Sequence, residues 1–92
     1  TREVQIMQKN DMEKTITFSI HEEDRDRERR QLLRAVYDAL TEKGHQPIDQ
    51  LVGYILTEDP TYITNYKNAR SLIRRIDRYE LIAALLKEYL GV

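Results

Sequence analysis

Cysteine and tryptophan are absent from this chain, and histidine occurs only twice, as His21 and His45. Without cysteine, the chain can form neither a disulfide bond nor a thiolate metal site. Two histidines fall short of the ligands that a dedicated zinc site needs. The three glycines lie far apart, so no glycine-rich loop can cradle a phosphate group. We therefore expect no metal and no cofactor.

Long apolar stretches and a strong charge of one sign are also missing. No apolar run approaches the ~20 residues that span a bilayer, and no signal peptide is recognisable. Lys and Arg total 15 against 16 Asp and Glu, which gives a net charge of −1. A general nucleic-acid binder usually carries a basic excess that displaces counterions from phosphates. These features favour a cytoplasmic protein without a membrane partner and argue against nucleic acid as a partner.

The length of the chain limits both its core and its chemistry. Its 92 residues make one domain at most. A chain of this size buries roughly 60–65% of its unfolded surface, so association is the remaining route to stability when no disulfide is present. No serine lies in the sequence context of an activated nucleophile. We expect a protein that is not an enzyme and that forms an oligomer.

The first 20 or so residues differ from the rest in the spacing of their apolar residues. Their apolar residues alternate with polar ones, a pattern typical of short strands, and Asn10 with Asp11 suits a hairpin turn. The alternating residues are Val4, Ile6, Ile16, Phe18 and Ile20. We predict a flexible or weakly β N-terminal arm over residues 1–18, because an isolated hairpin is marginal in water. Whether residues 1–11 belong to the natural protein is left open.

Helical signals begin at Ser19, so residues 19–92 are assigned to a helical dimerisation domain. Ser19 with Glu22 matches a capping box, and the acidic residues that follow suit the positive end of a helix dipole. Gly44 then predicts the end of this first helix, because glycine readily adopts the left-handed conformation of a helix C-terminus. The apolar face of the helix consists of Leu32, Leu33, Val36, Tyr37 and Leu40.

A second helix is predicted to start at Pro47, which suits the first turn of a helix. Asp59 with Pro60 ends it and opens a short turn through Tyr62. Its apolar residues are Ile48, Leu51, Val52, Tyr54, Ile55 and Leu56. They cover an arc of roughly 200°, which is more than one packing surface needs.

A third helix is predicted from Asn65 to Ile76, and Asp77 with Glu80 repeats the capping pattern that starts a new one. The last helix carries Leu81, Ile82, Leu85, Leu86, Tyr89 and Leu90 and is apolar over most of its circumference. Two helices with surplus apolar surface in so small a chain imply a shared interface. The sequence thus predicts an all-α fold, a small bundle of about four principal helices per chain, in a homodimer.

Three arginines, Arg70, Arg74 and Arg78, recur at i, i+4 and i+8 and predict a basic stripe on the flank of the third helix. Guanidinium groups suit phosphate or carboxylate recognition. The stripe is interpreted either as a partner-binding surface or as a solvated face paired with Asp77 and Glu80. A symmetric dimer could also present two stripes to adjacent grooves of DNA, so a nucleic-acid-binding module is the alternative function.

One stretch of the chain resembles a known family. Residues 44–54 read G-H-Q-P-I-D-Q-L-V-G-Y, and matching residues continue through Arg78. This closely resembles the IreB/ReoM family of regulatory phosphoproteins of Gram-positive bacteria, over about residues 14–90. The chain departs from the usual family residues at His45, Gln46, Asp49, Thr57, Glu58, Tyr66 and Tyr79. Exposed positions of this kind bear on which partner is bound.

The resemblance implies a helical homodimer that is a substrate of a membrane-bound PASTA-type Ser/Thr kinase and its cognate phosphatase. It also implies control of peptidoglycan synthesis through protein–protein contacts, in some members by governing how Clp-protease machinery degrades an early cell-wall enzyme. The family's acceptor threonine lies in the N-terminal arm shortly before a Phe. That position matches Thr15, with Thr17 as a second candidate.

The chemistry of the arm allows both a plain and a functional interpretation of these threonines. Alternation places Thr15, Thr17 and Ser19 on one side of an extended segment. They are either ordinary solvent-facing strand residues or, as the resemblance favours, phosphoacceptors in an extended and accessible peptide. Phosphorylation would add about −1.5 to −2 charge and three strong acceptor oxygens. Our hypothesis is that the arginine stripe contacts a protein partner, and that the phosphorylated arm competes for this stripe or reshapes it.

Overall fold

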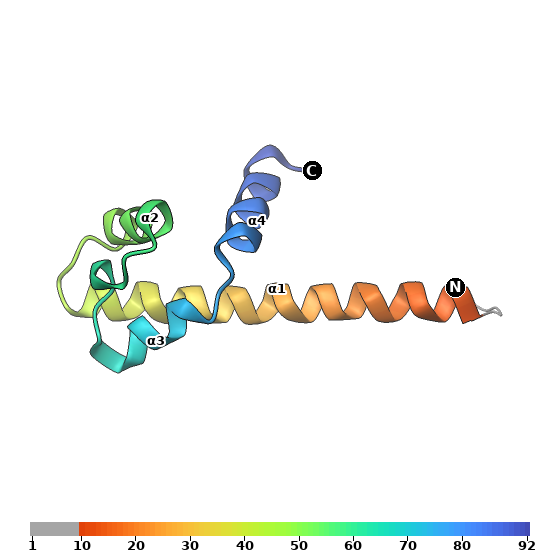
Figure 1. Cartoon of the computed structure of the whole chain (residues 1–92), viewed down its shortest axis with the longest axis horizontal. Helices are drawn as coiled ribbons and strands as arrows, with labels where there is room; N and C mark the ends of the chain where they lie inside the picture. The colour runs from red at the N-terminus through yellow and green to blue at the C-terminus, as the bar shows by residue number, and fades with distance from the viewer. Residues whose placement is uncertain (1–9) are drawn as a thin grey trace.

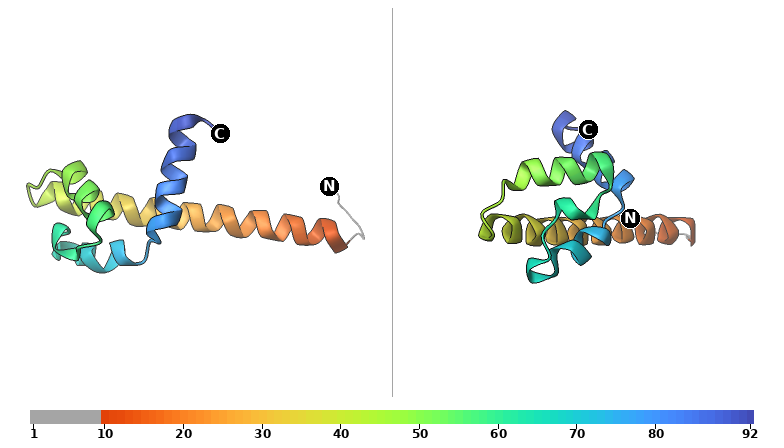
Figure 2. Two further views of the ribbon diagram at one scale, coloured as in Figure 1. Left: turned by 45° about the horizontal axis from the view of Figure 1, so that its top comes forward. Right: turned by 60° about the vertical axis from the view of Figure 1, so that its left-hand side comes forward.

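The structure is a computed structural model that describes residues 10–92, with side chains from residue 22 onward. Over these residues it is all-helical, as predicted. The long helix α1 (Asn10–Glu42) forms the axis of the molecule. Helices α2 (Pro47–Thr57) and α4 (Arg78–Leu90) rise on one side of it, and α3 (Ala69–Arg74) lies on the other (Figures 1 and 2). The molecule measures 54 × 27 × 19 Å.

The core lies against the C-terminal half of α1, where the predicted apolar face packs. Val36 and Leu40 of α1 are fully buried, and α2 contributes Leu51 and Tyr54. The remaining buried apolar residues are Leu32, Ala39, Ile63, Ala69, Ile73, Ile76 and Leu81. The core therefore forms where α2, α3 and the residues that flank α3 fold back onto α1.

The end of α1 and the starts of α2 and α4 follow from local signals, which the sequence predicted. The amide N–H of Gly44, at φ +80°, donates to the Thr41 carbonyl at 3.0 Å, and that of His45 donates to the Leu40 carbonyl at 3.0 Å. These two bonds form a Schellman motif, which satisfies carbonyls left open at the helix end. Pro47 occupies the first turn of α2. Asp77 caps α4 by accepting a hydrogen bond from the Glu80 amide at 3.1 Å.

The predicted third helix is shorter than expected. Two 3₁₀ turns, η1 (Pro60–Tyr62) and η2 (Tyr66–Asn68), precede α3, which has only six residues. Lys67 and Asn68 have φ values of 52° and 62°, in the left-handed region, and so an α-helix cannot begin at Asn65. The helix predicted from about Asn65 to Ile76 is therefore found only over Ala69–Arg74, and its predicted start is wrong.

The largest correction concerns the N-terminal arm. Helix α1 begins at Asn10 and crosses Ser19 without a break, so the strand prediction for Ile16, Phe18 and Ile20 is wrong. Adding residues to an existing helix avoids the cost of nucleation, and a five-residue alternation is too weak a signal to oppose that extension. Residues 1–9, which include Val4 and Ile6, lie outside the described residues.

Candidate interaction surfaces

The most prominent surface feature is exposed apolar surface on α2. Ile48, Val52 and Leu56 recur at i, i+4 and i+8 and form a stripe that we call the α2 face. All three are exposed, Leu56 to 76% of its surface, while Leu51 and Tyr54 of the same helix pack into the core. The wide apolar arc predicted from the sequence is therefore divided between the core and an open face.

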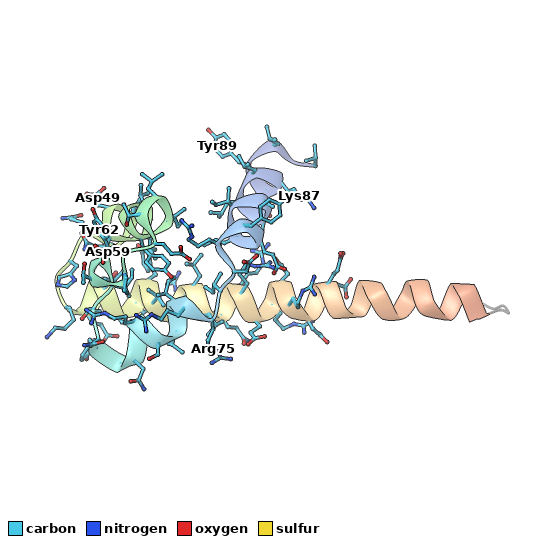
Figure 3. The ribbon with its side chains drawn as sticks, viewed as in Figure 1. Asp49, Asp59, Tyr62, Arg75, Lys87 and Tyr89 are labelled. Atoms are coloured by element: carbon cyan, nitrogen blue, oxygen red, sulfur yellow. The ribbon has the colours of Figure 1, made fainter. Side chains whose placement is uncertain are left out.

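Helix α4 exposes even more apolar surface. Its residues are all described, and Leu81 is the one that is buried. We call Ile82, Leu85, Leu86 and Tyr89 the α4 face. Tyr89 is 91% exposed. Figure 3 shows it on the side of α4 toward α2, with Lys87 on the opposite side. Single exposed apolar residues are ordinary, but contiguous faces of this kind mark interaction sites.

Polar contacts hold α4 to α1. The guanidinium of Arg29, whose side chain is 15% exposed, lies 3.1 Å from Glu80 and 3.0 Å from Asp26. Arg30 pairs with Asp26 at 2.7 Å and reaches Glu88 at 3.5 Å. The hydrogen bond from Arg30 is the main cause that lowers the pKa of Asp26 below its ordinary value. Exposed ion pairs contribute little stability, so the contacts of the less exposed Arg29 stabilise the packing of α4 on α1 more than those of Arg30 do.

A hollow of about 600 Å³ lies between α1 and α4, on the side of α4 that carries Lys87. Its charged lining consists of Glu22, Arg25, Asp26, Arg29, Arg30, Glu80, Lys87 and Glu88. Four basic and four acidic side chains balance, so the hollow does not favour an anion or a cation. This hollow was not predicted from the sequence, in which the run of acidic and basic residues over 22–30 is the signal that relates to it.

The three predicted partner-binding arginines are placed differently from the expected stripe. Helix α3 ends at Arg74, and Arg78 belongs to the first turn of α4, so no single helix carries all three. Arg70 donates from Nε to the Ile63 carbonyl at 2.9 Å. Arg78 donates to the Ile55 carbonyl and to Glu58. Arg74 is exposed. The geometry of a continuous stripe was wrongly predicted, while its role in partner binding stays a prediction.

The segment between α2 and α3 is held by specific contacts. The ring of Tyr62 lies on the backbone of Gly53, where a β-carbon would come within 2.6 Å of its Cδ1 atom. Gln50 donates from Nε2 to the Tyr62 carbonyl at 2.8 Å. Asp59 accepts hydrogen bonds from the backbone and hydroxyl of Thr61, which lower the pKa of its carboxyl group. These contacts fix the turn that Asp59 and Pro60 were predicted to open.

A second tyrosine of this segment, Tyr66, lies among charged side chains. The ammonium groups of Lys43 and Lys67 are 5.4 and 5.5 Å from the centre of its ring, which is the geometry of a cation–π interaction. Lys67 also pairs with Glu42 at 3.0 Å. These contacts tie η2 to the C-terminal end of α1.

The candidate phosphoacceptors Thr15 and Thr17 lie in α1, near its N-terminal end. This end projects well past α4 (Figure 1). The structure places this end of α1 away from α3 and α4, the helices that carry Arg70, Arg74 and Arg78. It does not bring the two predicted sites together.

Within the described part of the chain, no group of three or more His, Asp or Glu side chains is arranged to hold a metal ion. Among the same residues, no helix is both long enough and apolar enough to cross a membrane. The main features of the described surface are the α2 face, the α4 face and the ion pairs along α1. The chain is thus a small helical protein with two exposed apolar faces.

Comparison with known proteins gives the particular family. The family described as "IreB regulatory phosphoprotein" matches residues 13–91, which is nearly the whole chain. A protein of Ruminiclostridium cellulolyticum with the name "UPF0297 protein" is 54% identical over 76 residues, covering 83% of this chain and 85% of the relative. The chain belongs to the IreB family of regulatory phosphoproteins. The resemblance found in residues 44–54 is thereby confirmed.

Proposed function

We propose that this protein is a cytoplasmic, non-enzymatic regulator of peptidoglycan synthesis that is switched by a PASTA-type Ser/Thr kinase and its cognate phosphatase. The observation that carries the proposal is membership of a family of regulatory phosphoproteins. Thr15 is the proposed main acceptor and Thr17 the second. The regulator acts through protein–protein contacts, with an adaptor or the Clp-protease machinery as the downstream partner.

A homodimer is part of the same proposal, and the apolar faces support it. Helices α2 and α4, which carry the two faces, lie on the same side of α1. A second copy of this chain offers an equivalent pair of faces, so a two-fold arrangement can cover both. Closed symmetric association also leaves no apolar face open for uncontrolled aggregation.

The proposed partner surface contains Arg70, Arg74 and Arg78, and their contacts decide how to test it. Charge reversal at Arg70 or Arg78 would also break a hydrogen bond to a backbone carbonyl, and so would confuse binding with folding. Arg74 is exposed, so Arg74→Glu changes the charge of the surface with the least structural effect. Loss of partner binding with unchanged thermal unfolding supports the surface; full binding by R74E contradicts it.

Intact-mass spectrometry after incubation with the cognate kinase tests the central proposal. The wild-type chain should gain the mass of one or two phosphate groups, and the cognate phosphatase should remove them. Thr15→Ala should abolish most of the gain, Thr17→Ala a smaller part, and the double variant all of it. Ser71→Ala, which removes an exposed hydroxyl in α3, is the matched control. A double variant that still accepts phosphate would refute the assignment.

A further inference from the structure

Helix α1 carries two start signals in one sequence. In the structure the helix begins at Asn10 and passes through Ser19 as continuous helix. Nevertheless Ser19 and Glu22 have the spacing of a capping box, and Glu23 and Asp24 are the acidic residues that favour a first turn. A helix that starts at Ser19 is therefore encoded inside the longer helix that is observed.

The two parts of α1 on either side of Ser19 differ in what supports them. Residues 22–30 are held by ion pairs within the helix, such as Asp24–Arg27 at 2.7 Å and Asp26–Arg30 at 2.7 Å. Residues 10–18 read N-D-M-E-K-T-I-T-F. Six of these nine residues (Asn, Asp, two Thr, Ile and Phe) are among the weaker helix formers. Intrinsic helix stability therefore falls at the position where the second start signal lies.

Tertiary packing does not compensate for this weakness. Among the described elements, none lies beside the N-terminal end of α1 in any of the views (Figures 1 and 2). In proteins, most helical stability comes from such packing rather than from propensity. Without it, extension of the helix from Ser19 back to Asn10 is close to balance, because each added residue gains one hydrogen bond and loses its backbone freedom.

We propose that residues 10–18 exchange between the observed helix and a released, extended segment, with Ser19 as the N-cap of the shorter helix. We further propose that phosphate on Thr15 or Thr17 shifts this equilibrium toward release. The second statement rests on the proposed function, whereas the first does not. In the long helix a phosphate on Thr17 lies four residues from Glu13, and like charges at this spacing destabilise a helix. Release removes that repulsion and presents the segment to a kinase or phosphatase in an extended conformation.

The exchange is measured from the ¹³Cα chemical shifts of residues 10–18 in the full chain by NMR. Ser19→Ala removes the internal cap and adds a better helix former, so the ratio of helical to released segment should rise about tenfold. Thr17→Ala also removes a hydroxyl and adds alanine but touches no cap, and should raise the ratio only about threefold. Ser19→Asp retains a capping side chain and should not increase the helical population.

An equal effect of S19A and T17A would overturn the internal cap. Shifts over residues 10–18 that match those of residues 22–30 in every variant would also overturn it, because they would show one rigid helix.

Phosphothreonine installed at position 17 during synthesis of the chain tests the second statement without a kinase. The shifts of residues 10–18 should move to released values, while those of residues 22–42 stay helical. A phosphorylated segment that remains helical would overturn the coupling and leave the kinase assignment standing. Failure of the kinase to modify the chain would instead refute the proposed function and leave the S19A result untouched.

Discussion

The contact between Tyr62 and Gly53 gives the sharpest test of how the fold is held together. Gly53 lies in the middle of α2 with an ordinary helical backbone, so alanine there should strengthen the helix by about 1 kcal/mol. However, the added β-carbon would lie 2.6 Å from Cδ1 and 2.9 Å from Cζ of Tyr62. The ring must therefore leave its position in Gly53→Ala.

The cost of that movement outweighs the gain in helix propensity. Tyr62 is 37% exposed, so most of its surface is covered by neighbouring residues. An aromatic side chain buries 150–250 Å² when fully packed, and losing part of this at about 25 cal/mol per Å² costs about 2 kcal/mol. The net effect of G53A should be a loss of about 1 kcal/mol in the free energy of unfolding.

A double-mutant cycle separates the two contributions. In a Tyr62→Ala background the ring is absent, so adding G53A should stabilise the chain by about 1 kcal/mol, which reverses the sign of its effect and implies a coupling of about 2 kcal/mol. Urea unfolding of the wild type, the two single variants and the double variant, all at the same protein concentration, measures these free energies. If G53A shifted the free energy in the same direction in both backgrounds, the reasoning would be refuted.

Three further predictions concern the association of the chain, one helix cap and one ion pair. Leu86→Glu places a charge in the α4 face and should convert a dimer into a monomer in light scattering, whereas Gln31→Glu on the exposed side of α1 should not; a dimeric L86E would contradict the interface. Asp77→Ala removes the side-chain cap of α4 and should lower the free energy of unfolding in urea by about 1 kcal/mol. An unchanged free energy of unfolding would show that this cap does not stabilise the chain. Because the hydrogen bond from Arg30 holds the pKa of Asp26 below 3.8, the stability from this pair is complete above that pH and is lost as pH falls through the lowered pKa. Asp26→Asn should therefore lose less stability on acidification than the wild type, and equal losses would show that the pair contributes nothing.

The parts of the fold that the sequence predicted correctly depend on short-range physics. Gly44, Pro47 and Asp77 each act within one helical turn, through a left-handed backbone, a missing N–H or a side-chain cap. Such signals are contained in the residues themselves. The wide apolar arcs were equally visible, because exposed faces follow directly from helical spacing.

The errors came from features that depend on a wider context. Nothing in Lys67 signals a left-handed conformation, which a lysine adopts only when surrounding contacts such as those to Glu42 and Tyr66 hold it. The prediction of an arginine stripe required one continuous helix, although the Asp77 cap already implied that a new helix starts at about Arg78. Because consecutive helices change direction, regular spacing across a cap does not place residues on one face.

The proposed homodimer would link the stability of this chain to the surfaces through which it binds partners. The core is small, and the α2 and α4 faces remain open in the single chain. Covering them with a second copy would add apolar burial that the chain alone does not have. Any macromolecule that displaced this second copy would have to cover equivalent apolar surface. A partner that binds elsewhere, for example at Arg74, can instead act on the dimer without dissociating it, and comparing the L86E and R74E variants for partner binding distinguishes the two modes.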